Sequence, residues 1–183
     1  SPAKNLDFSE NQNCFNSKSS PSFLEKTNFL VKKLKTLSCT QIKNLMKISD
    51  KLSELNKDRF NNFSYKFNDL NTRQAIFAFK GDTYKGLNIN SFNESEIKVA
   101  QKRLRILSGL YGILKPLDLI QPYRLEMGSN VSSVIGEDLY GYWSEIVTNR
   151  INDEMKKSKN KYLINLASVE YAKVINKNKL NFE

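Results

Sequence analysis

The glycines of this chain are confined to roughly a third of its length, which limits where the backbone can turn sharply. All seven lie between Gly81 and Gly141. Glycine readily adopts positive φ angles and lets the backbone approach another molecule closely. Half of the six arginines, Arg103, Arg105 and Arg124, lie in the same window, and arginine holds planar anions with paired hydrogen bonds. We therefore expect the functional site in this window and scaffold around it.

Charge is distributed in blocks along a chain of 183 residues, a length that suffices for one well-buried domain over 1–183. The net charge is +10, and lysine outnumbers arginine 23 to 6, so a compositional bias toward lysine explains part of it. Residues 97–124 carry a net +5, whereas residues 125–155 carry −5. Such blocks indicate a molecule with one basic face, and a basic face favours polyanions such as nucleic acid.

The residue types present exclude several kinds of chemistry. Without histidine, these residues cannot form a Ser-His-Asp triad, a Cys-His pair or a histidine-ligated zinc site. Cys14 and Cys39 are not in a Cys-x-x-Cys pair, which favours a reducing cytoplasm over a disulfide framework. We expect no membrane partner, because no apolar run reaches the ~20 residues of a membrane span. The polar start shows no signal peptide and lacks a methionine, so we expect a trimmed chain.

Apolar periodicity and turn residues predict an α+β protein, with a mixed sheet flanked by helices. We expect helices over 20–37, 40–55, 93–108 and 138–157, with Asp50 as an alternative break in the second. Strands are favoured over 72–80, 121–127 and 162–166. We expect no metal or cofactor, because the carboxylates and amide that could bind a cation have no diagnostic spacing: Asp82, Asp118, Glu126, Asn165 and Glu170.

The first candidate site is the glycine turn at Leu107–Leu114. A helix, a tight turn and a second helical turn would make a helix–hairpin–helix-like element. Its free backbone amides would hold a phosphate without reading bases. The alternative is a left-handed cap at Gly109 followed by an ordinary tight turn.

The second candidate is a group of cations beside glycine or proline turns: Lys4, Lys80, Lys115 and Arg124. If these turns converge, they line a basic cleft suited to phosphates; otherwise they are unrelated surface cations. Among the aromatic residues, Tyr84, Tyr111 and Tyr123 are placed to stack on a base or a ribose. We expect the other aromatic residues near these turns to lie in the core: Phe77, Phe79, Tyr140, Tyr142 and Trp143.

Eight short motifs occur in a fixed order along the chain: Ser1-Pro-Ala-Lys4, Ile48-Ser-Asp-Lys-Leu52, Arg73-Gln-Ala-Ile76, Ala78-Phe-Lys-Gly-Asp82, Leu107-Ser-Gly-Leu-Tyr-Gly112, Pro116-Leu-Asp118, Gln121-Pro-Tyr-Arg-Leu-Glu-Met-Gly128 and Asn165-Leu-Ala-Ser168. Each is weak alone. In this order they make the chain resemble the YaaA family of bacterial peroxide-stress proteins, from its first residue to its last.

The resemblance implies an α/β fold of family-specific topology, a positively charged cleft and a helix–hairpin–helix element that binds double-stranded or branched DNA. It also implies a role in the response to hydrogen peroxide and a chain truncated at both ends. Transferred to this sequence, the hairpin residues are Ser108, Gly109, Leu110, Tyr111 and Gly112. The cleft residues are Lys4, Lys80, Arg103, Arg105, Lys115 and Arg124.

The leading hypothesis is a cytoplasmic DNA-binding protein of the oxidative stress response, associated with DNA repair and showing little sequence preference. The first alternative is an enzyme acting on a small phosphorylated or nucleotide-like substrate in the same cleft. The second is a structural adaptor in repair complexes. A pocket narrower than a duplex would favour the enzyme, and a broad open groove would favour DNA. The sequence leaves the oligomeric state and any catalysed reaction open.

Overall fold

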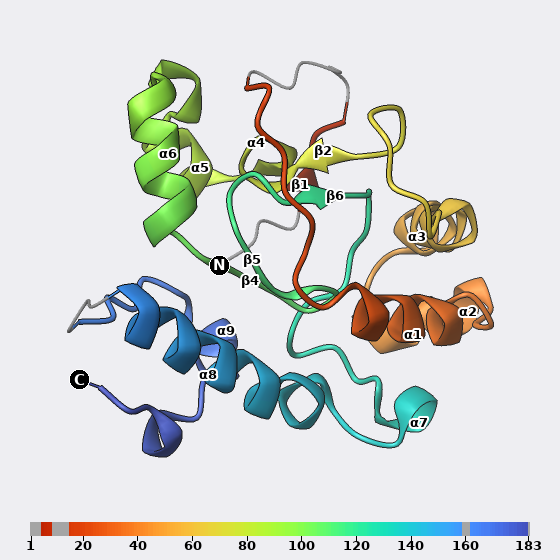
Figure 1. The fold of residues 1–183 in the computed structure, drawn as a ribbon. Coiled ribbons are helices and arrows are strands. Elements are labelled where there is room, and N and C mark those ends of the chain that lie inside the picture. The colour runs from red at the N-terminus through yellow and green to blue at the C-terminus, as the bar shows by residue number, and fades with distance from the viewer. Residues whose placement is uncertain (1–4, 9–14, 159–161, 183) are drawn as a thin grey trace.

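Short strands lie at the centre of the molecule, and helices surround them (Figure 1). The structure, a computed structural model, describes residues 5–8, 15–158 and 162–182. Its helices are α1 (Leu24–Leu34), α2 (Cys39–Met46), α3 (Asp50–Asn62), α4 (Ala75–Ala78), α5 (Asp82–Leu87), α6 (Glu94–Arg103), α7 (Ser132–Ile135), α8 (Leu139–Ser158) and α9 (Val169–Ala172). Its strands are β1 (Asn5–Leu6), β2 (Arg73–Gln74), β3 (Phe79–Lys80), β4 (Ile106–Ser108), β5 (Gly112–Leu114) and β6 (Leu119–Ile120).

The longer helices begin where side chains can cap them. Ser38 and Gln41 form a reciprocal capping box at the start of α2, and Asn93 and Glu96 do the same for α6. The helix expected over 40–55 is broken near Asp50, because Lys47 takes a left-handed conformation (φ 53°) and ends α2. Ser49 then caps α3. The helix expected over 138–157 is confirmed as α8.

The strands form three separate antiparallel pairs in place of one mixed sheet. They are β1 with β3, β2 with β6, and β4 with β5. The registers pair Leu6 with Phe79, Gln74 with Leu119, and Ile106 with Leu114. A parallel bridge joins Ser19 to Asp118. The class, a mixed α and β fold, is therefore confirmed.

Three expected strands take other conformations. Residues 72–80 form β2, the single buried turn α4 and β3, because β2 pairs with β6 whereas β3 pairs with β1, and the chain turns between the two pairs. Residues 121–127 are irregular. Residues 162–166 are also irregular, and Tyr162, Ile164 and Leu166 are exposed, since no described strand pairs with them.

The hydrophobic core is built around the β4–β5 hairpin. Trp143 of α8 is fully buried and packs against this hairpin, and Thr27 of α1 donates its hydroxyl to the carbonyl of Leu110 (3.1 Å). Phe77 and Phe79 are buried as expected, while Tyr140 and Tyr142 are half-buried. Within the described ranges, no helix has the length and apolar character needed to cross a membrane.

Candidate functional site

The glycine turn at Leu107–Leu114 is a β-hairpin, so the helix–hairpin–helix expected there is wrong. Helix α6 ends at Arg103, and Leu104 is extended (φ −86°, ψ 140°). Strand β4 follows at once and pairs with β5 through a turn at 109–111. The β-branched residues Ile106 and Ile113 favour strand over helix. The tight turn depends on Gly112, whose φ is +71°.

Backbone N–H groups of this turn form hydrogen bonds within the protein. The hydroxyl of Ser108 accepts hydrogen bonds from the backbone N–H of Leu110 (3.3 Å) and of Tyr111 (3.0 Å). The indole N–H of Trp143 donates to the carbonyl of Gly109 (2.9 Å). All five residues from Ser108 to Gly112 are buried. They are therefore core residues, and their predicted role as a phosphate cradle does not fit this geometry.

Two of the tyrosines expected to stack on bases belong to the same core. Tyr111 and Tyr123 pack edge to face, with ring centroids 5.3 Å apart. The hydroxyl of Tyr123 shares a hydrogen bond with Ser108 (2.7 Å), and the hydroxyl of Tyr111 accepts one from the N–H of Gln121 (3.0 Å). Burial raises the pKa of both phenols. Tyr84 is half-buried against Phe79.

Arg105 holds two helices together instead of facing solvent. Its Nε donates to Oε2 of Glu154 on α8 (2.5 Å), and its Nη1 donates to the carbonyls of Gln101 and Leu104. Arg150 binds the other oxygen of Glu154 (2.7 Å). Burial would raise the pKa of Glu154, but the hydrogen bonds and charges of the two arginines outweigh it, so this pKa lies below its ordinary value.

The last turns of α6 and of α8 both carry exposed cations. The Arg105–Glu154 ion pair joins the residues after α6 to the last turns of α8. Within seven residues of one of its two members in the chain are five exposed cations that no described carboxylate pairs with, together called the basic ridge: Lys98, Lys102, Arg103, Lys156 and Lys157. Asp153 is an exposed carboxylate in the same part of α8. Predicted residue Arg103 is thus exposed, two residues before the arginine of this ion pair.

Lys115 lies at the inner edge of this region. The register of β4 and β5 places it beside Arg105 at the open end of the hairpin. Its backbone N–H donates to the buried carboxylate of Asp118 (2.8 Å). Burial raises the pKa of Asp118, while hydrogen bonds from Ser19 and Lys115 oppose that rise.

Two further cations lie in the lining of a cavity of about 370 Å³, called the arginine cavity. Arg59 of α3 and Arg73 of β2 both line it. Arg73 is 8% exposed, and its Nη1 donates to the backbone carbonyl of Asp7 (3.0 Å). Burial and the nearby charge of Arg124 lower the pKa of Arg59. The structure therefore places one buried and one partly buried arginine in the lining of the same cavity.

The predicted residues Lys80 and Arg124 border this second group. The ammonium of Lys80 forms an ion pair with Asp7, which also lies 3.8 Å from Nη1 of Arg73. Arg124 donates to Glu126 (3.0 Å). The predicted cleft residues thus divide between two places: Arg103, Arg105 and Lys115 at one, and Lys80 and Arg124 at the other. Lys4 lies outside the described residues.

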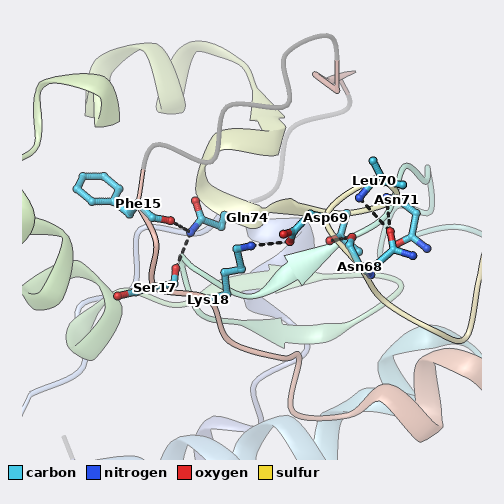
Figure 2. Close-up of polar contacts among 9 residues, drawn as sticks. Phe15, Ser17, Lys18, Asn68, Asp69, Leu70, Asn71 and Gln74 are labelled. Carbon is cyan, nitrogen blue, oxygen red and sulfur yellow. Dashed lines mark hydrogen bonds and ion pairs between the residues drawn. The ribbon is translucent and has the colours of Figure 1, made fainter.

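Polar contacts fix one wall of the arginine cavity (Figure 2). Asn68 accepts hydrogen bonds from the backbone N–H groups of Leu70 (2.9 Å) and Asn71 (3.1 Å). Lys18 holds the carboxylate of Asp69 at 2.5 Å. Figure 2 also shows the amide of Gln74 donating to the carbonyls of Phe15 (3.0 Å) and Ser17 (2.6 Å). Residues 69–71 are thereby placed at the cavity.

The carboxylates considered for cation binding are dispersed. Asp82 contacts Lys85, Glu126 contacts Arg124, and Glu170 accepts the N–H of Gly128. In the part of the chain that the structure describes, no three His, Cys, Asp or Glu residues are grouped to hold a metal ion. Cys39 is a free thiol, and Cys14 lies outside that part.

Sequence reasoning missed Arg59 and Arg73 as site residues. Both lie outside the glycine window, in elements expected to serve as scaffold. A usable signal existed, because arginine is scarce in a chain with 23 lysines. Where arginine occurs in a lysine-rich chain, its planar fork of N–H donors matters more to the position than its charge.

Comparisons with known proteins agree over the whole chain. A family model described as peroxide stress protein YaaA matches residues 1–183. A UPF0246 protein of Shewanella halifaxensis (strain HAW-EB4) is 46% identical over 99% of this chain and 70% of its own length. One from Legionella pneumophila (strain Philadelphia 1) is 49% identical over 100% of this chain and 71% of its own. A UPF0246 protein of Aliivibrio fischeri (strain MJ11) is 48% identical over 96% of this chain and 67% of its own length. The chain therefore belongs to the YaaA family of peroxide stress proteins.

Proposed function

We propose that the protein binds the phosphate backbone of DNA through the basic ridge, as part of the response to hydrogen peroxide. The observation that carries this proposal is the junction of α6 and α8, where Arg105 and Arg150 neutralise Glu154. Because that carboxylate is already paired, the surrounding ammonium and guanidinium groups are left to attract external anions. A cluster of this kind suits a polyanion with evenly spaced charges.

The ridge favours backbone contacts over base readout. Lys98 and Lys102 lie four residues apart on α6, so they face the same side of the helix. Lysine is a compact point charge on a flexible stem, and it binds phosphates without the paired geometry that recognises a base edge. We therefore propose affinity for duplex or branched DNA with little sequence preference.

The proposal is tested with the double variant Lys102→Gln/Lys156→Gln, which removes one charge from each helix. Glutamine keeps the helix propensity of lysine. If each lysine neutralises one phosphate, DNA binding at about 0.1 M salt falls roughly 60-fold. Binding is measured by fluorescence anisotropy on two duplexes of unrelated sequence.

The matched control is Lys32→Gln/Lys51→Gln, which removes two exposed charges from α1 and α3 on the other side of the molecule (Figure 1). The control is expected to change binding less than about threefold. Equal losses in both double variants would show that net charge alone is responsible. Loss on only one of the two duplexes would show base readout. Either outcome contradicts the proposal.

A further inference from the structure

We propose that the arginine cavity is a binding site for a small nucleotide, with its phosphate held by Arg73 and Arg59 and its base against the apolar rim. This site is distinct from the basic ridge. Its volume of about 370 Å³ lies within the range of small-molecule pockets and is far too small for a duplex. The cavity is also bordered by backbone that polar contacts hold in place.

The described residues use only part of the guanidinium group of Arg73. The Nε of Arg73 is buried, and the described residues offer it no hydrogen-bond acceptor. Its Nη1 reaches Asp7, so only part of the guanidinium fork is used. A buried charged N–H without an acceptor is costly. Arg73 lines the cavity, and guanidinium groups bind phosphate through paired N–H donors, so a phosphate there would use the part of the fork that the protein leaves open.

Two further guanidinium groups, those of Arg59 and Arg124, lie at or near the cavity. Arg59 lines the same cavity, and its Nη1 makes only a long hydrogen bond to Asn56 (3.4 Å). Arg124 is close enough to Arg59 to affect its ionisation, and the Nε of Arg124 is also buried without a described acceptor. Like charges in partly buried positions repel one another, so a bound dianion would stabilise both arginines.

The charges around the cavity are not all positive. Asp7 pairs with Lys80 and Arg73, Glu126 pairs with Arg124, and Asp69 pairs with Lys18. Asp58 lines the cavity and is exposed. Asp7, Glu126 and Asp69 are each paired, and Asp58 is the residue before Arg59 in the same cavity lining. This mixture of positive and negative charges around the cavity suits one phosphate group and disfavours a long polyanion.

Part of the cavity lining is apolar. Phe8, Leu55, Leu70 and Pro122 lie around the same cavity as the arginines. Leu70 is 88% exposed and Leu55 is 43% exposed, although both are large apolar side chains. An aromatic base offers a flat surface that such side chains cover, and Phe8 adds a ring on which a base can stack. Phosphate and base contacts together identify a nucleotide rather than inorganic phosphate.

The test is isothermal titration calorimetry of the full chain with adenosine 5′-monophosphate, adenosine and inorganic phosphate. The nucleotide is expected to bind with a Kd below about 1 mM. Adenosine and inorganic phosphate are each expected to bind at least about tenfold more weakly, because each makes only half of the contacts. No detectable nucleotide binding, or equal affinity for inorganic phosphate, would overturn the proposal.

Two variants place the ligand in the cavity. Arg59→Gln is expected to weaken nucleotide binding at least about tenfold, and Lys51→Gln on the same helix is its control with unchanged affinity. Leu70→Ala, at an exposed position that the fold does not need, is expected to weaken nucleotide binding but not phosphate binding. Unchanged nucleotide affinity in Arg59→Gln and Leu70→Ala would overturn the assignment. The ridge variant Lys102→Gln/Lys156→Gln is expected to bind the nucleotide normally, so the two proposals can fail separately.

Discussion

At the scale of single residues, Trp143 explains why the glycine turn is packed inside the protein. Its ring occupies the space that a side chain at position 112 would need, and its indole N–H donates a hydrogen bond to the carbonyl of Gly109. A Cβ atom on Gly112 would come within 2.6 Å of the ring. The glycines that a sequence pattern assigns to ligand binding therefore serve close packing inside the protein.

The space around Gly112 and Gly86 predicts the effects of two alanine substitutions. Gly112→Ala places a side chain at φ +71° and against Trp143, so it should lower the free energy of unfolding by about 2–3 kcal/mol. Gly86→Ala in α5 meets nothing within 4 Å and should raise it by about 0.5–1 kcal/mol. Thermal denaturation measures both. A neutral Gly112→Ala would mean that the hairpin does not pack as described.

Arginine and lysine also divide by role at this scale. Arg59, Arg73, Arg105 and Arg124 are wholly or partly buried and bind specific oxygens or line the cavity, whereas most lysines are exposed. Sequence reasoning gave Arg105 and Arg103 the same role. Their environments differ because Glu154 is 49 positions from Arg105 along the chain, a separation that no local pattern reveals.

At the scale of elements, helices with caps could be predicted and short strands could not. The sequence around Asn93 and Glu96 contains its own start signal, and α8 has an uninterrupted apolar face. Strands of two or three residues are defined by partners elsewhere in the chain, as Gln74 is by Leu119. The 3.6-residue period could be carried past Arg103 to Ser108, although the structure changes to strand at Ile106.

The contact between α6 and α8 gives a prediction with a defined pH dependence. Arg105→Ala should lower the free energy of unfolding by about 1–3 kcal/mol at neutral pH, since it leaves Glu154 with Arg150 alone. The pKa of Glu154 is below its ordinary value of 4.5 in the folded protein. The stabilisation is therefore present above that value and is lost as the pH falls through the folded pKa.

Urea denaturation from about pH 7 to pH 3 checks this dependence. The gap in stability between the wild type and Arg105→Ala should shrink as the solution becomes acidic. Lys102→Ala, at an exposed position on α6, should leave a small gap that does not change with pH. A gap that is constant, or that grows in acid, would show that Arg105 does not act through Glu154.

At the scale of the whole molecule, the two proposed anion sites differ in composition. The basic ridge is open and rich in lysine, whereas the arginine cavity is small, partly apolar and rich in guanidinium groups. Charge blocks along the sequence indicated a basic face. They could not show that the cleft cations divide between two places, because that division depends on the partners Asp7, Glu126 and Glu154.

The central claim is that DNA is held by phosphate contacts to the ridge, and the salt dependence of binding tests it most directly. If five cations each neutralise a phosphate, a plot of log K against log salt has a slope of about −4.5. Affinity then falls roughly 500-fold between about 50 and 200 mM salt. The ridge double variant should reduce the slope by about two. A flat salt response of the unaltered protein would contradict the account.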